Sequence, residues 1–204
     1  MSASKPPGKR DNSSPELKAT LRERMLKDLK EPHVLDCFCG NGEMWRRVYQ
    51  GRAAEYVGLD REKVHSRKLC LLMDNRQYVG AHDISRFNVI DLDAYGCPWA
   101  LVYRVLERAG AGPLALFVTD GLIESLNRKS MPSHIVSATQ RIPKSMPIPA
   151  PGRWYVAMFK TMLLDAGGRY GWRVTRGLHG FNSGKTVCYW GLRLERHKGS
   201  PKQM

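Results

Sequence analysis

The ten residues His33–Gly42 (HVLDCFCGNG) decide the fold of this chain. An apolar run reaches Asp36, the glycine turn Gly40-Asn41-Gly42 follows, and a helical pattern begins near Glu43. Glycine permits a sharp turn and a close approach of the backbone to a ligand, and the helix N-terminus beyond it offers free N–H groups. This order predicts the strand, turn and helix that begin an α/β sheet. Many strand-to-helix turns contain glycine for geometry alone, so the turn by itself does not predict a ligand.

The same alternation of strands and helices continues along the chain. Further apolar runs predict strands at 55–60, 78–82, 87–93 and 114–119, and helices are predicted at 15–31, 62–73, 99–109 and 154–166. Apolar strands that alternate with helices are typical of a parallel sheet covered on both faces. Two β-rich stretches at 172–178 and 186–195 predict an antiparallel pair. The predicted fold class is therefore α/β: a Rossmann-like, seven-stranded, mostly parallel sheet with a C-terminal antiparallel hairpin and helices on both faces.

The length of 204 residues suits one well-cored domain, which we place at 15–197 between disordered tails at 1–14 and 198–204. No apolar run is long enough to cross a bilayer, and the basic N-terminus lacks the apolar core of a secretory signal. Five cysteines are an odd number, and Cys37 and Cys39 are spaced too tightly for a CxxC-type zinc site. We therefore expect a cytoplasmic protein with reduced thiols and no metal.

The net charge of +14 is distributed unevenly along the chain. The last 84 residues hold 14 Lys and Arg against three Asp and Glu. Such a surface favours a polyanion, because phosphate contacts release condensed counterions. A solubilising surface is the alternative, although solvated faces usually mix both signs. We expect a nucleic acid partner, RNA or DNA, whose phosphates contact Arg128, Lys129, Arg141, Lys144 and Lys185.

Acids at predicted strand ends are candidate ligands of a nucleotide-like cofactor. Asp60 ends the second strand 18 residues beyond Gly42, near the offset at which an acid accepts hydrogen bonds from ribose hydroxyls. Asp83 follows the third predicted strand, where a carboxylate can accept a hydrogen bond from an adenine amine. For both acids, a capping or turn role is the structural alternative.

The stretch Asn88–Pro98 (NVIDLDAYGCP) places two acids and an aromatic residue at the end of the fourth strand. Acids at the end of a buried strand are costly unless they face a cleft. We expect Asp93, with Asp91 second, to accept an N–H of an aromatic amine, and Tyr95 to stack on an extruded base. Alternatively, the acids cap a helix and Tyr95 belongs to the core. A cytosine-C5 mechanism through Cys97 is disfavoured by its order, Cys-Pro.

These motifs resemble those of class I S-adenosylmethionine-dependent methyltransferases, in which an acid precedes the glycine turn. The segment FNVIDLDAYGCP is similar to the DLDPFGSP-type motif of tRNA guanine-N2 dimethyltransferases and, more distantly, to the DPPY-type motif of amino-methyltransferases acting on DNA. The chain departs from the tRNA family at Ala94, where proline is usual, and at Cys97, where a small hydroxyl residue is usual. The resemblance implies that S-adenosylmethionine is bound by Asp36, Phe38, Gly40, Asn41, Gly42, Asp60, Arg61, Asp83 and Asp91.

The charge and the motifs together predict a methyltransferase that acts on an exocyclic amine of a nucleic-acid base, with tRNA-like RNA favoured over DNA. A methyltransferase-like module that binds nucleic acid without catalysis is the main alternative. A methyltransferase acting on a protein or a small molecule is a third possibility, which the basic C-terminal portion disfavours.

Overall fold

Seven strands form one mixed sheet in this computed structural model, which describes residues 14–62, 66, 68–94, 96–123 and 151–197. The elements in chain order are α1 (Pro15–Leu26), β1 (His33–Asp36), the π-helix η1 (Trp45–Tyr49), β2 (Glu55–Asp60), β3 (Cys70–Leu72), α2 (Asn75–Ala81), β4 (Val89–Leu92), α3 (Trp99–Arg108), β5 (Leu114–Asp120), α6 (Pro151–Tyr170), β6 (Trp172–Phe181) and β7 (Cys188–Arg196).

The strands lie in the order β3-β2-β1-β4-β5-β7-β6. The first five are parallel, whereas β7 pairs antiparallel with both β5 and β6. The predicted Rossmann-like fold with a terminal antiparallel hairpin is therefore confirmed. The strand order reverses between β1 and β4, and in open α/β sheets ligands bind beyond the carboxyl ends of the strands at such a point.

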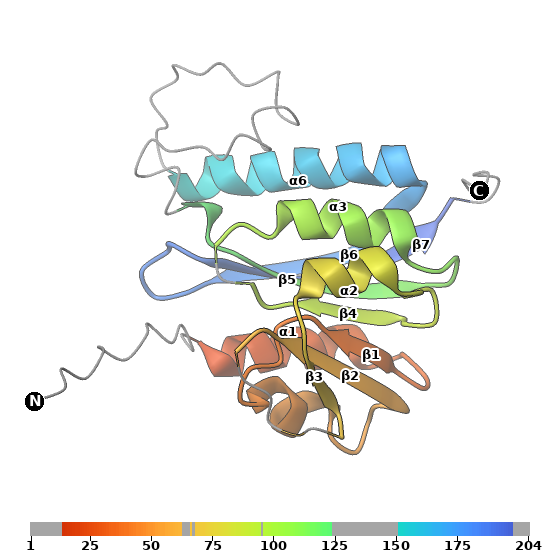
Figure 1. Cartoon of the computed structure of the whole chain (residues 1–204). Coiled ribbons are helices and arrows are strands. Elements are labelled where there is room, and N and C mark those ends of the chain that lie inside the picture. Colours follow the sequence, from red (N-terminus) through yellow and green to blue (C-terminus); the bar gives the residue numbers. More distant parts are fainter. Residues whose placement is uncertain (1–13, 63–65, 67, 95, 124–150, 198–204) are drawn as a thin grey trace, which may run out of the picture.

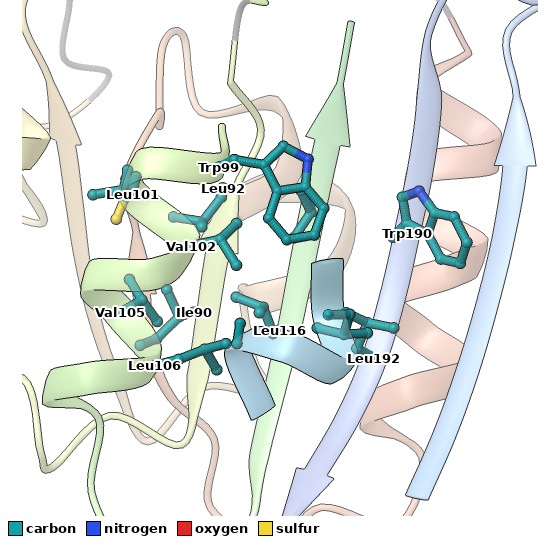
Figure 2. Packing of buried hydrophobic residues seen from close by; sticks show 14 of the residues in the cluster. Ile90, Leu92, Trp99, Leu101, Val102, Val105, Leu106, Leu116, Trp190 and Leu192 are labelled. Carbon is teal, nitrogen blue, oxygen red and sulfur yellow. The ribbon is translucent and has the colours of Figure 1, made fainter. Parts of the chain in front are cut away.

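Helices cover both faces of the sheet: α3 and α6 lie on one face, and α1 and η1 lie on the other (Figure 1). On the first face, Val102, Val105 and Leu106 of α3 point toward Ile90 and other buried strand residues (Figure 2). A helix with apolar residues at positions three and four apart buries one stripe in this way. None of the helices in the described ranges has the length and apolar character needed to cross a membrane.

Two predicted elements between β2 and β4 are wrong. Residues 70–72 form the edge strand β3 where a helix was expected, and residues 75–81 form the helix α2 where a strand was expected. The carboxylate of Asp74 accepts hydrogen bonds from the backbone N–H groups of Arg76 and Gln77 and so caps α2. The chain therefore crosses back along the sheet as a helix before β4 begins.

Candidate active site

The glycine turn is held in place by Asp60. The Gly40 N–H donates to Asp60 Oδ2 at 3.0 Å, and the Glu62 N–H donates to Asp60 Oδ1 at 2.8 Å. Gly40 and Gly42 have φ values of +48° and +76°, a region that favours glycine. The bond to the Glu62 N–H belongs to a turn and not to a helix cap, and the Asp60 carboxylate also ties the end of β2 to the glycine turn.

Three other predicted cofactor residues lie around this turn. The Phe38 side chain is half-buried against the core, and the Asn41 carbonyl accepts a hydrogen bond from Arg46 Nη1 at 2.7 Å. Arg61 is largely exposed and lies 3.8 Å from the Asp74 carboxylate, measured from Nη1 to Oδ2. The ends of β1, β2 and β3 are thereby brought together.

The prediction that Asp83 lies beside a cofactor is wrong for this fold. Asp83 follows α2, which returns the chain to the amino-terminal edge of the sheet, and its carboxylate accepts from the Ser85 N–H at 2.8 Å. That hydrogen bond is the main cause of a lowered Asp83 pKa. The end of β3 instead presents Asp74 and Asn75, and Asn75 Nδ2 donates to the Cys37 carbonyl at 3.1 Å. In the sequence, Asp74 is an acid directly before a short helix. It was missed because the sequence predicts a helix at 62–73 and a strand at 78–82.

A buried polar layer separates α1 from the carboxyl ends of β1, β4 and β5. Its members are Lys18, Arg22, Asp36, Tyr49, Tyr56, Asp91, Asp93 and Thr119. The charged members Lys18, Arg22, Asp36 and Asp91 each expose 4% or less of their surface. The sequence singled out the three acids of this layer but missed its two cations.

Asp91 is an internal anchor of this layer. Arg22 Nη2 and Nε donate to its two carboxylate oxygens at 2.6 and 2.7 Å, and the Tyr49 hydroxyl donates to Oδ2 at 2.6 Å. The Asp91 side chain has no exposed surface. Its predicted roles as a cofactor ligand and as an amine acceptor are therefore corrected, because bonded neighbours enclose both oxygens.

Asp93 follows β4 and, unlike Asp91, reaches the surface, with 18% of its side chain exposed. Lys18 Nζ lies 2.9 Å from Oδ1 and 3.0 Å from Oδ2, and the Thr119 hydroxyl donates to Oδ1 at 2.6 Å. Burial raises the pKa of Asp93, but the charges of Lys18 and Arg22 and the Thr119 hydrogen bond outweigh it, so the pKa is lowered. Asp93 is therefore an ionised hydrogen-bond acceptor at neutral pH.

Asp36 lies beside Asp91 in the register of β1 and β4. The Tyr56 hydroxyl donates to Asp36 Oδ2 at 2.8 Å, and the Phe38 N–H donates to Oδ1 at 3.1 Å. Burial and the neighbouring Asp91 charge raise the pKa of Asp36 to about 8. At pH 7 Asp36 is therefore mostly uncharged. It holds the backbone before the glycine turn as a neutral group, through the Phe38 N–H.

This raised pKa predicts that Asp36→Asn will increase stability in alkaline solution. A folded-state pKa above the unfolded value means that the native protein holds the proton more tightly, so stability is lost as the pH rises through about 8. Asparagine cannot ionise, and between pH 6 and 9 the wild type should lose about 3 kcal/mol relative to Asp36→Asn. Urea denaturation at both pH values measures this difference. Asp83→Asn is the control, because the lowered pKa of Asp83 keeps it ionised throughout. An equal pH dependence of wild type and Asp36→Asn would show that Asp36 is charged at neutral pH.

Asp120 ends β5 on the opposite face of the sheet. Its carboxylate accepts from Trp99 Nε1 at 2.9 Å, from the Tyr155 hydroxyl at 2.8 Å and from the Leu122 N–H at 2.8 Å. Burial raises its pKa to about 6. Since these bonds join β5 to α3 and α6, Asp120 fixes the elements that border the site, and sequence reasoning gave it no role.

The other predicted substrate contacts are only partly covered. Tyr95, Arg128, Lys129, Arg141 and Lys144 lie outside the described residues. Lys185 lies in the turn between β6 and β7, exposed and with a φ of +51°. Because Cys188 pairs with Asp120, this turn projects beyond the carboxyl edge of β5, on the side of the sheet edge where Asp93 lies.

Comparisons with known proteins show which solved folds are similar. Neither a protein-family model nor a curated protein sequence matches the chain. The putative methyltransferase YhhF from Escherichia coli has a TM-score of 0.53 at 13% identity, over 94% of this chain and 90% of that chain. TYW2 from M. jannaschii, solved in complex with AdoMet, has a TM-score of 0.52 at 8% identity, over 89% and 77%. A putative hemolysin from Lactococcus lactis has a TM-score of 0.58 at 12% identity, over 90% and 87%. At these identities the likeness shows a shared fold, which this chain has in common with methyltransferases.

Proposed function

We propose that this protein is an S-adenosylmethionine-dependent methyltransferase that modifies an exocyclic amine of a nucleic-acid base, with RNA favoured over DNA. The observation that carries the proposal is that Asp60 holds the glycine turn after β1, and that the neighbouring strand β4 is followed by Asp93. These groups lie at the carboxyl edge of a sheet whose solved neighbours include a protein crystallised with AdoMet. When bound, this cofactor supplies an electrophilic methyl group on a sulfonium.

The residues at the ends of β1, β2 and β3 fit such a cofactor. Asp60 ends β2 with a carboxylate, the group that accepts hydrogen bonds from ribose hydroxyls in nucleotide-binding α/β folds, and the left-handed turn at Gly40 allows a close approach of the backbone. Asn75 and Asp74 follow β3 at the same edge of the sheet, where they would face the adenine of the cofactor. Asp36 holds the turn through the Phe38 N–H and needs no direct contact with the ligand.

Asp93 is proposed as the residue that orients the methyl acceptor. An aromatic amine is a weak nucleophile, because its lone pair is delocalised into the base. A carboxylate that accepts one N–H directs the remaining lone pair and favours the charge that develops on nitrogen. Asp93 is ionised, partly exposed and held by Thr119 and Lys18, which suits it to this task.

The preference for a nucleic acid rests on charge. A net charge of +14, concentrated beyond residue 120, is the footprint of a polyanion-binding protein, and Lys185 lies at the site's edge of the sheet. The basic residues 128, 129, 141 and 144 belong to the same proposal. A module that binds nucleic acid without transferring a methyl group remains the second candidate, since the basic surface by itself does not require catalysis.

Transfer of a labelled methyl group tests the proposal. The full-length protein should move the label from S-adenosylmethionine to pooled tRNA, rRNA or DNA, and nucleoside analysis should find it on an exocyclic nitrogen. Asp93→Ala should lower the rate about 10- to 100-fold through loss of a charge-assisted hydrogen bond, with cofactor affinity unchanged. Asp83→Ala, at the opposite edge of the sheet, is the matched control and should keep the wild-type rate. Cofactor binding without label in any nucleic acid would contradict the choice of substrate, and RNA binding without label would favour the inactive module.

A further inference from the structure

Lys18 occupies an unusual place for a cation on an amphipathic helix. Only 6% of its side chain is exposed, and its ammonium group contacts both oxygens of Asp93. The same nitrogen lies 5.2 Å from the centre of the Tyr189 ring. A buried charge is tolerated when it is paired and hydrogen-bonded, so α1 contributes this lysine specifically to the end of β4.

The charges of the buried polar layer balance at neutral pH. Arg22 pairs with Asp91 and also lies 4.0 Å from Asp93, measured from Nη2 to Oδ2, and Lys18 pairs with Asp93. Asp36 is mostly protonated, because burial and Asp91 raise its pKa to about 8. Asp120, the acid that ends β5, turns to the opposite face toward Trp99 and Tyr155. The α1 side of the site therefore offers no unpaired negative charge among the described residues.

Asp93 nevertheless keeps the capacity to accept a hydrogen bond. Of about four acceptor positions on a carboxylate, one receives the Thr119 hydroxyl and two face Lys18. The remaining position suits one N–H of a neutral amine. A cationic amine would be attracted much less than by a free carboxylate, because the Lys18 ammonium already lies within 3.0 Å of both oxygens and repels a second positive charge.

We propose that Lys18 is a specificity-determining residue. By neutralising the charge of Asp93, where the methyl acceptor would bind, it makes the site select an uncharged nucleobase amine over the ammonium group of a lysine side chain or a small amine. This inference rests on the proposed methyltransferase function and narrows its substrate class. The charge of the methyl acceptor would thereby distinguish a nucleic-acid enzyme from a protein-lysine enzyme.

Two cofactor analogues can measure the charge around Asp93, where the methyl acceptor would bind, before any substrate is known. Sinefungin carries a primary amine where the cofactor carries its S-methyl group, and this amine is cationic at pH 7. S-adenosylhomocysteine is neutral at that position and otherwise similar. Calorimetric titration of the full-length protein with each compound gives the ratio of the two dissociation constants. A general loss of stability in a variant would weaken the apparent binding of both compounds equally, so it would leave this ratio unchanged.

For the wild type, we expect the two compounds to bind within a few-fold of each other. Lys18→Met removes the nearer cation of Asp93 and leaves Arg22 Nη2 at 4.0 Å from Oδ2, so sinefungin should gain about three- to tenfold over S-adenosylhomocysteine. Lys18→Arg, which keeps the charge, should retain the wild-type ratio, and Lys18→Met/Asp93→Asn should lose the gain. Should Lys18→Met fail to fold, Lys18→Gln replaces it in the same comparison.

The outcomes separate the inference from the function on which it rests. Binding of both analogues with a ratio that Lys18→Met leaves unchanged would overturn the role of Lys18 and leave the proposed cofactor intact. Strong preference for sinefungin in the wild type would also overturn it, because an unneutralised carboxylate would then face the acceptor. Failure of both analogues to bind the folded wild type would instead contradict the methyltransferase proposal.

Discussion

Arg22→Met should lower the free energy of unfolding by about 3–5 kcal/mol, the usual effect of breaking a buried ion pair by removing one partner. Arg22 donates to both oxygens of Asp91 and, through Nη1, to the Lys18 carbonyl at 2.9 Å. Without it, the fully buried Asp91 keeps the Tyr49 hydroxyl but loses its positive partner. Urea denaturation at pH 7 measures the change, and Arg24→Met, an exposed arginine on the same helix, should change stability by less than about 0.5 kcal/mol.

A second variant identifies the cause of this loss. Arg22→Met/Asp91→Leu replaces the pair with apolar side chains, and such replacements of buried ion pairs are often neutral or stabilising. The double variant should therefore be more stable than Arg22→Met. A double variant as unstable as the single one would show that Arg22 acts through packing, for example against the Phe117 ring 5.3 Å from its guanidinium carbon.

Asp60→Ala should weaken S-adenosylmethionine binding about 100- to 10,000-fold, since two hydrogen bonds to a charged group are each worth about 1.5–3 kcal/mol. The change removes the acceptors proposed for the ribose and also the bond that holds the Gly40 N–H. Calorimetry measures the affinity, and circular dichroism checks that the variant is folded. Asp83→Ala is the matched control, because Asp83 is an acid that likewise accepts from the backbone N–H two residues on, at the opposite edge of the sheet. A similar affinity in Asp60→Ala and wild type would exclude Asp60 from the site.

The sequence predicted the sheet well where strands are buried and end in an acid. The run 55–60 is β2 as observed, and the run before the glycine turn is β1. The prediction was wrong between β2 and β4 for a physical reason. β3 is a three-residue edge strand with Leu71 and Leu72 exposed at 43% and 65%, so it lacks the pattern of a buried strand. α2 has seven residues, too few to show helical periodicity clearly.

The cations of the buried polar layer could not be found from local sequence. Lys18 and Arg22 lie one helical turn apart, next to the apolar stripe of α1, where basic residues are usually solvated. Their burial depends on Asp93 and Asp91, which are 75 and 69 residues away along the chain. The helix predicted at 15–31 is observed as α1, but the pairing of its cations with the end of β4 could be seen only in the structure.

Calorimetric titration of the folded, cofactor-free, full-length protein with S-adenosylmethionine tests the central claim most directly. The geometry of the glycine turn, Asp60 and the end of β3 predicts one site per chain with a dissociation constant in the micromolar range. An absence of binding heat, together with an absence of thermal stabilisation by excess cofactor, would contradict the methyltransferase proposal and leave a basic nucleic-acid-binding module on the same fold.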